Sequence, residues 1–338
     1  MSKKHKPIIG ITLGDINGVG PEVVLKALAD NRLLNFIVPV IYGSTKIISF
    51  YKKNIELEEF HYTQVKDSNQ FLSKKINVLN CWQDDIEITP GKSTKEGGDC
   101  ARKALEKASQ DLKDGYIDAL VTAPINKENM QSDAFKFPGH TEYFTKILEA
   151  EESLMFMVSE RLRVGVVTGH MPLKDVVARV DQKLVKTKLK IMETSLKKDF
   201  GITKPRIAVL GLNPHAGENG LLGVEEEEII TPIVTDFKKR GSLVFGPFSA
   251  DGFFGSGEFE KFDGVLAMYH DQGLIPFKSL SFGSGVNYTA GLPAVRTSPD
   301  HGTGYGIAGM NKASEDSLRS AILAAMDVCN MRKENAGI

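Results

Sequence analysis

Residues 262–309 read FDGVLAMYHDQGLIPFKSLSFGSGVNYTAGLPAVRTSPDHGTGYGIAG, the stretch of the chain richest in reactive side chains set between glycines. It opens with an apolar run, Gly264 to Tyr269, that has the length and composition of a buried strand. His270 and Asp271 follow where this strand is expected to end. Because glycine lets the backbone approach a small polar molecule closely, we expect the stretch to form the floor of an active site. Glycine-rich loops are expected to carry its other functional groups, which are Lys278, Asn287, Arg296 and the run His301-Gly302-Thr303-Gly304.

Apolar, strand-like runs alternate with amphipathic, helix-like runs along the rest of the chain. The predicted strands are Ile8–Leu13, Phe36–Tyr42, Ile76–Leu79, Ala119–Thr122, Leu154–Val158, Val164–Thr168, Ile207–Leu212 and Gly264–Met268. The predicted helices are Glu22–Ala29, Asp99–Lys113, Glu142–Ala150, Gln182–Lys198, Glu225–Lys239 and Glu315–Met331. This alternation predicts an α/β fold with a largely parallel sheet covered by helices on both faces. Such sheets bind ligands at the carboxyl ends of their strands, so residues that follow a strand are the first candidates for function.

The length of 338 residues is sufficient for two domains. Pro124 and Pro138 interrupt the pattern in the loop Ala123–Gly139, which is a candidate crossover between them. We expect the chain to return near Ser298–Gly302, which makes the first domain discontinuous. The acidic run Glu225–Glu228 is expected to be the solvated first turn of a helix, where its charge suits the helix dipole.

Composition excludes several classes of protein. The chain is 41% hydrophobic and 25% charged, as in an ordinary globular protein, and its net charge of -1 argues against nucleic acid as a partner. No apolar run approaches the ~20 residues of a membrane span, and the basic N-terminus lacks the apolar core of a signal peptide. The three cysteines have no metal-type spacing, which favours a reduced, cytoplasmic location.

Three histidines each follow a predicted strand directly: His170, His215 and His270. If the strands are parallel, or if two subunits face each other, the three imidazoles meet at one rim. Three neutral imidazoles leave a divalent metal open positions, as in catalytic sites, and they favour Zn²⁺ or Co²⁺ over Ca²⁺. The alternative is that each histidine is a solvated or hydrogen-bonded loop residue. The spacing between them matches no short metal-binding motif and does not decide between the two interpretations.

A second group of residues is suited to binding an anion. The segment FPGHTEYF places His140 and Thr141 at an expected helix start, where free N–H groups and the helix dipole attract anions. The alternative is that Thr141 is only the N-cap of that helix. Lys278, Asn287 and Arg296 offer donors suited to phosphate or carboxylate. The loop GDINGVGPE lacks the Lys-Ser/Thr ending of a nucleotide P-loop, so its glycines are expected only to shape a tight turn.

Nine motifs identify a resemblance that spans nearly the whole chain. They are GITLGDINGVGPEVVLKAL, VTAPINK, FPGHTEYF, VVTGHMPLKDV, GLNPHAGENGLLG, GPFSADGFF, AMYHDQGLIPFK, VNYTAGLP and RTSPDHGTGYGIAG. In this order they resemble the 4-hydroxythreonine-4-phosphate dehydrogenase family, oxidoreductases of pyridoxal phosphate (vitamin B6, pyridoxine) biosynthesis. The resemblance implies two α/β/α domains with a central cleft, similar to the isocitrate and isopropylmalate dehydrogenases. It also implies a homodimer whose active site is shared between subunits, with the counterpart of His270 supplied by the neighbour. On this basis we expect residues 1–128 with 300–338 to form the first domain, 129–299 to form the second with the dimer interface, and the active site to lie between them.

The resemblance implies NAD(P)-dependent oxidation of 4-phosphooxy-L-threonine to a 3-keto acid, which decarboxylates to 3-amino-2-oxopropyl phosphate. His170, His215 and His270 are implied to bind a divalent metal (Zn, Co or Mg), and His301–Gly304 to contact NAD or NADP. The phosphorylated substrate is implied to bind His140, Thr141, Lys278, Asn287 and Arg296. Many relatives carry an acidic residue for the ribose hydroxyls shortly after the HGT element, whereas this chain has Gly306. The resemblance therefore predicts no preference between NAD and NADP.

Asp251, Asp271 and Lys278 are the candidates for the catalytic proton acceptor, and the sequence does not choose between them. Asp271 has a second possible role, which is to orient the imidazole of His270. Two other functions also fit the motifs. One is a dehydrogenase of a related phosphorylated sugar acid, 4-phosphothreonate or 4-phosphoerythronate. The other is a non-catalytic protein that binds a phosphorylated metabolite, for which an open metal site serves no purpose.

Overall fold

The computed structural model describes residues 6–83, 85–131, 137, 139–281 and 283–337. The chain forms two compact units, of which unit 1 comprises 1–149 with 293–330, and unit 2 comprises 150–292 with 331–338. The sequence predicts a division into 1–128 with 300–338 and 129–299. The two units of the structure also divide the chain discontinuously, but their boundaries lie at other residues. Part of the expected crossover loop Ala123–Gly139, namely residues 132–136 and Pro138, lies outside the described residues.

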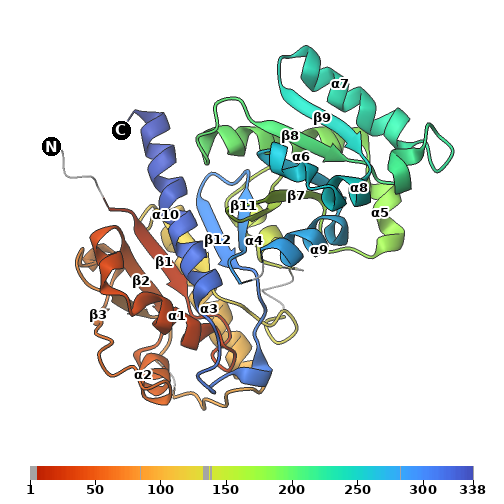
Figure 1. Ribbon diagram of the computed structural model, residues 1–338. Coiled ribbons are helices and arrows are strands. Elements are labelled where there is room, and N and C mark those ends of the chain that lie inside the picture. Colours follow the sequence, from red (N-terminus) through yellow and green to blue (C-terminus); the bar gives the residue numbers. More distant parts are fainter. Residues whose placement is uncertain (1–5, 84, 132–136, 138, 282, 338) are drawn as a thin grey trace. The chain divides into compact units, whose positions relative to one another are not determined.

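Unit 1 contains a parallel sheet with the strand order β3-β4-β2-β1-β5-β12 (Figure 1). Its strands are β1 (Ile8–Thr12), β2 (Val38–Gly43), β3 (Thr63–Val65), β4 (Asn77–Asn80), β5 (Ala119–Thr122) and β12 (Val295–Pro299). Central strands such as β2 are buried along their whole length because helices cover both faces. The carboxyl ends of these parallel strands therefore share one edge, where polar side chains can gather.

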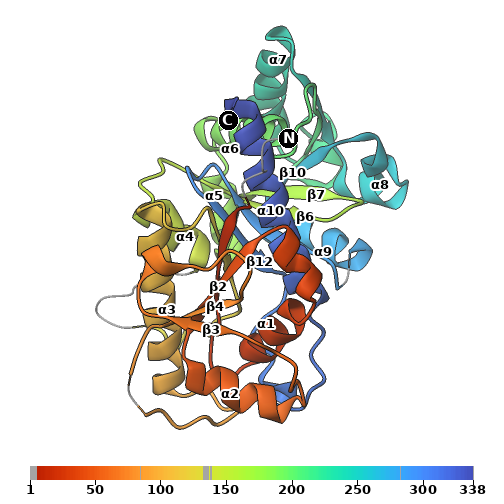
Figure 2. The same ribbon diagram turned by 90° about the vertical axis from the view of Figure 1, so that its left-hand side faces the viewer.

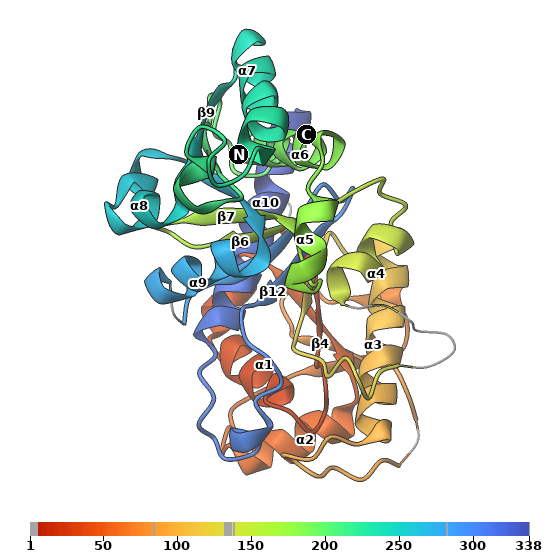
Figure 3. The ribbon, with the colours of Figure 1, turned by 90° about the vertical axis from the view of Figure 1, so that its right-hand side faces the viewer.

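The helices of unit 1 are α1 (Gly20–Leu28), α2 (Thr45–Asn54), α3 (Lys95–Lys113) and α4 (His140–Ile147), together with most of α10 (Asp316–Ala336). Helix α3 lies on one side of the sheet, and α1 and α2 lie on the other (Figures 2 and 3). Pro21 stands in the first turn of α1, where its missing N–H costs nothing. Thr94 caps α3 by accepting a hydrogen bond from the Gly97 N–H.

Unit 2 contains the strand order β11-β6-β7-β10-β8-β9. These strands are β6 (Leu154–Val158), β7 (Arg163–Thr168), β8 (Arg206–Leu210), β9 (Leu243–Phe248), β10 (Gly264–Tyr269) and β11 (Val286–Ala290). The neighbouring strands β7, β10, β8 and β9 are parallel to one another, whereas β6 runs antiparallel to both of its neighbours, β7 and β11. The expectation of parallel strands therefore holds for the three strands that precede the predicted metal ligands, and it fails for β6.

One prediction about residues 262–309 is wrong: Lys278, Asn287 and Arg296 do not lie in glycine-rich loops. Lys278 lies in the last turn of α9 (His270–Leu280), Asn287 on β11 and Arg296 on β12. Buried polar residues such as Thr289 and Thr297 interrupt the apolar pattern by which a strand is recognised. The substrate candidates therefore stand on regular elements, which hold side chains more rigidly than loops do.

The remaining helices of unit 2 are α5 (Leu173–Arg179), α6 (Gln182–Lys198), α7 (Thr231–Lys239) and α8 (Ala250–Gly255). Helices α6 and α9 cover opposite faces of the sheet. A Cβ atom at Gly165 or Gly264 would meet α6, whereas Val164 and Val166, which point the other way, contact Gly273 of α9. Among the helices of the described residues, none has both the length and the apolar character needed to cross a membrane.

Candidate active site

Arg296 is the centre of a buried polar cluster in unit 1. Its side chain is on β12, which pairs with β5, and it reaches the carboxyl end of β5. Arg296 is 1% exposed, and its Nη2 donates hydrogen bonds to Thr122 Oγ1 at 2.6 Å and to His140 Nδ1 at 3.0 Å. The guanidinium carbon also lies 5.6 Å from the centre of the Phe144 ring, so an aromatic face covers the cation.

The charges of this cluster suit an incoming anion. Burial lowers the pKa of Arg296 to about 9, although Glu142 acts in the opposite direction. Burial, and then the charges of Arg296 and Lys127, hold the pKa of His140 well below its usual value. Because the neutral His140 ring accepts a hydrogen bond at Nδ1, its proton resides on Nε2. That buried Nε2 has no hydrogen-bond partner among the described residues, so it can donate to a ligand oxygen.

Thr141 is the second residue of α4, whose N-cap is Gly139. The alternative that Thr141 serves as the N-cap is therefore wrong. Its carbonyl accepts a hydrogen bond from Thr145 Oγ1 at 2.7 Å within the helix. The start of α4 thus presents backbone N–H groups next to His140, which adds to the attraction for an anion.

The loop after β1 and the segment His301–Gly304 pack backbone against backbone. The Val19 N–H donates to the Thr303 carbonyl at 2.8 Å, and a Cβ at Gly18 would lie only 2.7 Å from that oxygen. Gly14 has a φ of 68°, and a Cβ there would lie 2.2 Å from the Pro124 carbonyl oxygen. These glycines shape a tight turn, as the sequence predicts, and they also make room for the HGT element.

Asp15 holds this part of unit 1 together. Its carboxylate is fully buried and accepts hydrogen bonds from the Asn17 N–H at 2.9 Å, Asn129 Nδ2 at 2.8 Å and the Tyr305 hydroxyl at 2.7 Å. His301 Nδ1 lies 3.0 Å from the Gly302 carbonyl, and its buried Nε2 has no partner among the described residues. Gly306 lies in an exposed turn that follows. The proposed cofactor segment is therefore anchored to the glycine turn through buried contacts.

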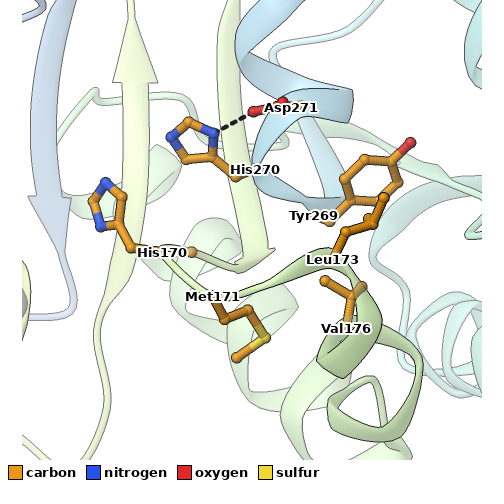
Figure 4. Close-up of a pocket in the computed structure, with 8 residues that line it drawn as sticks. His170, Met171, Leu173, Val176, Tyr269, His270 and Asp271 are labelled. Atoms are coloured by element: carbon orange, nitrogen blue, oxygen red, sulfur yellow. Dashed lines mark hydrogen bonds and ion pairs between the residues drawn. The ribbon is translucent and has the colours of Figure 1, made fainter.

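In unit 2, His170 and His270 lie beside one another in a pocket at the carboxyl ends of β7 and β10 (Figure 4). The centres of their rings are 5.3 Å apart. Asp271 Oδ1 lies 2.7 Å from His270 Nδ1, which leaves Nε2 for another ligand. A carboxylate on the far nitrogen is the usual partner of a histidine that binds metal, because it fixes the ring and increases its basicity. Apolar side chains complete the pocket, namely Met171, Leu173 and Val176.

His215 lies in the turn after β8 and is exposed. Among the described residues, the structure contains no group of three or more His, Cys, Asp and Glu side chains spaced to hold a metal ion. The structure therefore brings two of the three predicted ligands together within one chain, and His215 is outside that pair. The imidazoles of His170 and His270 are suited to be two of the ligands of a divalent metal, with Asp271 bonded to the second ring.

Of the other candidates, Asp251 is exposed at the start of α8. Its pKa is lowered by the Ser249 hydroxyl, by the Gly252 N–H and by the nearby His215. Lys278 is exposed in the last turn of α9. On β11, the buried Asn287 Oδ1 has no hydrogen-bond partner among the described residues. Asp251 is thus associated with the turn of His215, whereas Asp271 is bonded to His270.

Four residues that contribute to these sites are not predicted as site residues from the sequence: Asp15, Thr122, Lys127 and Glu226. Asp15 comes shortly after β1, so the rule applied to the histidines identifies it as well, whereas Thr122 is the last residue of β5 itself. Glu226 contradicts the expectation of a solvated acidic turn. It is 2% exposed and accepts hydrogen bonds from the Leu212 and Asn213 N–H groups, both at 2.7 Å. Nothing in the acidic run itself distinguishes Glu226 from Glu227 and Glu228, which are exposed.

These features define an α/β protein that has a buried cluster of Arg296, Thr122 and His140 in one unit and a pair of strand-end histidines in the other. The chain belongs to the family of the pyridoxal phosphate biosynthetic protein PdxA, whose sequence profile matches residues 35–325. The resemblance described from the motifs is thereby confirmed.

Similar proteins cover almost the full chain. It is 48% identical to a 4-hydroxythreonine-4-phosphate dehydrogenase of Bacteroides thetaiotaomicron, over 99% of this chain and 92% of that protein. It is 39% identical to a D-threonate 4-phosphate dehydrogenase of Cupriavidus necator, over 97% of this chain and 99% of the other. The crystal structure of 4-hydroxythreonine-4-phosphate dehydrogenase from Klebsiella pneumoniae superposes with a TM-score of 0.81 at 34% identity, covering 97% of this chain and 99% of that one.

Proposed function

We propose that this chain oxidises 4-phosphooxy-L-threonine with NAD⁺ or NADP⁺ to a 3-keto acid, which loses CO₂ to give 3-amino-2-oxopropyl phosphate. This is an oxidative decarboxylation in vitamin B6 biosynthesis. The observation that carries the proposal is the fully buried Arg296 guanidinium, which is hydrogen-bonded to the neutral His140. A buried cation of this kind is matched by the dianionic phosphate of the substrate. The name of the relative with 48% identity supports the same reaction.

Arg296, His140 and Thr141 would bind the phosphate, with Lys278 and Asn287 as further substrate contacts. Holding the phosphate fixes the position of the reacting carbon, and such positioning is worth up to ~7–11 kcal/mol. His301–Gly304 would contact the nicotinamide cofactor, which accepts the hydride. The Nε2–H of His140 would donate to a phosphate oxygen, since Nδ1 already accepts from Arg296.

His170, His215 and His270 would hold a divalent ion, Zn, Co or Mg, which supplies a Lewis acid for the substrate hydroxyl and for the carbonyl formed from it. Asp271 would orient His270 through the 2.7 Å hydrogen bond. Asp251 is a weak base because the Ser249 hydroxyl, first of all, lowers its pKa. Asp251, Asp271 and Lys278 are the three candidates for the group that accepts the proton from the substrate hydroxyl.

The test is an absorbance assay for NAD(P)H on a panel of phosphorylated four-carbon acids. The panel holds 4-phosphooxy-L-threonine, D-threonate 4-phosphate and D-erythronate 4-phosphate, each with both cofactors and with Zn²⁺, Co²⁺ or Mg²⁺ after chelation. The proposal expects the largest kcat/KM for the amino acid and loss of turnover with EDTA. Fastest turnover of D-threonate 4-phosphate would support the second candidate, which the Cupriavidus necator relative favours. Binding without turnover for every compound would identify a binding protein and reject both activities.

A shared homodimeric site is also part of the proposal. Large apolar side chains next to the histidine pocket are exposed in a single chain, including Leu173 at 70%, Val177 at 53% and Ile275 at 63%. Exposed apolar surface of this kind is typical of a subunit interface.

Mixing the inactive variants His170→Ala and His270→Ala tests the sharing. If His270 serves the neighbour's site, each mixed dimer regains one intact site, and random mixing restores roughly a quarter of the activity. If His270 serves its own chain, beside the His170 that lies 5.3 Å away, mixing restores no activity.

A further inference from the structure

The buried peptide group of Met268 lies between the strands that precede the three candidate histidines. Strand β10 is central among them, with β7 on one side and β8 on the other. Met268 is fully buried and stands two residues before His270. Side chains from two other elements bind its carbonyl and its N–H, which makes this peptide a junction between the strand ends.

Gln272 binds the N–H side of this junction. The ladder between β10 and β8 ends at the pair Leu266 and Val209. Two residues further along each strand are Met268 and Gly211, where the strands are no longer paired. Gln272 Oε1 accepts a hydrogen bond from the Met268 N–H at 2.7 Å, and its Nε2 donates to the Gly211 carbonyl at 2.7 Å. The side-chain amide of Gln272 thus connects the two backbones at a point where no direct backbone pairing remains.

Thr168 binds the carbonyl side. Its hydroxyl donates to the Met268 carbonyl at 2.8 Å, and this bond is buried. Thr168 is the last residue of β7 and stands two residues before His170. The end of β10 is therefore fixed to β7 by a hydroxyl and to β8 by the amide of Gln272.

The turn that carries His215 depends on such external support. His215 and Ala216 have φ values of 52° and 51°, a left-handed conformation that residues with a Cβ rarely adopt. Strain of this kind persists only where the surroundings fix the backbone. The peptides just before the turn are held in succession: Gln272 binds the Gly211 carbonyl, and Glu226 binds the Leu212 and Asn213 N–H groups.

We propose that Gln272 is a positioning residue that sets the end of β10, which carries His270, against the strained turn after β8, which carries His215. The inference rests on the proposed metal-dependent function for its effect on activity, whereas its effect on the backbone is independent of that function. Gln272 is not assigned any contact with substrate, cofactor or metal. Its role is to hold two backbone segments from which candidate ligands project.

Two variants and a control test this role. Gln272→Met keeps the length of the side chain and removes both hydrogen bonds. Gln272→Glu keeps the acceptor for the Met268 N–H and places a carboxylate oxygen against the Gly211 carbonyl, so it breaks only the link to β8. The control is Gln182→Met, because Gln182 Nε2 also donates to a backbone carbonyl of unit 2, that of Glu228 at 2.8 Å, but at an exposed position.

Binding of Co²⁺ to the full-length chain is measured by calorimetry and by the visible absorption spectrum of the bound ion. We expect both Gln272 variants to bind Co²⁺ about 10- to 100-fold more weakly, as is typical when a group that supports metal ligands is lost. The spectrum should also change, while Gln182→Met binds Co²⁺ like the unaltered chain. Wild-type affinity and spectrum in both Gln272 variants would overturn the inference. If Gln272→Met does not fold, Gln272→Glu decides alone.

Hydrogen exchange separates this inference from the proposed function. Peptides covering 211–219 and 264–270 should exchange faster in Gln272→Met than in Gln182→Met. If the unaltered chain binds no Co²⁺, the proposed metal site fails, and the exchange result then decides the positioning role. Unchanged exchange in both peptides would overturn that role.

Discussion

The two units differ in the surroundings of one arginine each: Arg296, which is 1% exposed, and Arg332, whose side chain is 15% exposed. In unit 2, Arg332 Nε donates to Asp199 Oδ1 at 2.7 Å, and its Nη2 donates to the Tyr288 hydroxyl at 3.0 Å. In unit 1, Arg296 is bonded to the hydroxyl of Thr122 and to the neutral ring of His140. Arg332 is thus bonded directly to a carboxylate, and the bonds of Arg296 to Thr122 and His140 are to neutral groups.

The pKa values of the two guanidinium groups move in opposite directions. Burial alone acts to lower the pKa of Arg332, yet Tyr288 and the Asp199 carboxylate raise it above its usual value. Burial lowers the pKa of Arg296 to about 9, and Glu142 offsets only part of this shift. Arg332 thus has the Asp199 carboxylate as its counter-ion, whereas burial is the largest influence on the pKa of Arg296. This difference supports the proposal that Arg296 binds the substrate.

The largest expected effect is on stability at Arg332. Arg332→Met should lower the free energy of unfolding by ~3–5 kcal/mol, because it leaves the Asp199 carboxylate buried without its partner. Urea unfolding followed by circular dichroism measures the change. The control is Arg240→Met, which breaks the exposed pair with Asp236 and should cost no more than ~0.5 kcal/mol. Equal costs for both variants would remove the distinction between a structural and a surface arginine.

Arg296→Met should show the reverse pattern, with a large loss of function and a small change in stability. We expect kcat/KM for the phosphorylated substrate to fall by roughly 30- to 1,000-fold, equivalent to ~2–4 kcal/mol, because a buried charged partner of the phosphate is lost. The free energy of unfolding should stay within ~1 kcal/mol of the wild-type value, since the variant also removes a charge that is costly to bury. A stability loss as large as that of Arg332→Met would place Arg296 among the structural arginines.

Inorganic phosphate should stabilise the protein through Arg296. At a phosphate concentration of about 10 to 100 times Kd, linkage predicts a gain of ~1.4–2.7 kcal/mol, which is seen as a higher Tm. Arg296→Met should abolish this gain, whereas Arg332→Met should keep it, although it starts from a lower Tm. A gain that survives in Arg296→Met would show that phosphate binds elsewhere.

Much of the fold that positions these side chains could be predicted from the sequence. Apolar runs locate most of the strands, and the position after a strand predicts that His170 and His270 lie close together, because parallel strands bring their ends to one edge. The contact between His140 and Arg296 could not be predicted in this way. The two residues are 156 positions apart, and only the pairing of β12 with β5 brings them together.

Glu226 shows a second limit of the sequence. An acidic run at the start of a helix favours a solvated turn, which is the wrong interpretation for one of its four residues. The burial of Glu226 is decided by the Leu212 and Asn213 N–H groups, which belong to a turn that bears no recognisable signal for it. Side chains that satisfy distant backbone groups depend on tertiary structure, so local patterns do not reveal them.

The smallest expected effect is the pH dependence that His140 adds to stability. Burial, and then Arg296 and Lys127, hold its folded pKa well below the usual 6.5. The unfolded chain therefore binds a proton at His140 before the folded chain does. The neutral ring makes its full contribution to the free energy of unfolding above pH ~6.5. This contribution decreases as the pH falls toward the folded pKa, by ~1 kcal/mol over the first pH unit below 6.5. His140→Gln should remove this slope from urea unfolding measured between pH 7 and 5.5, while the exposed His61→Gln should leave it unchanged.

A slope that persists in His140→Gln would mean that the ring is protonated in the folded state. Arg296 would then lie against a second cation, and the neutral donor proposed for the phosphate would be lost.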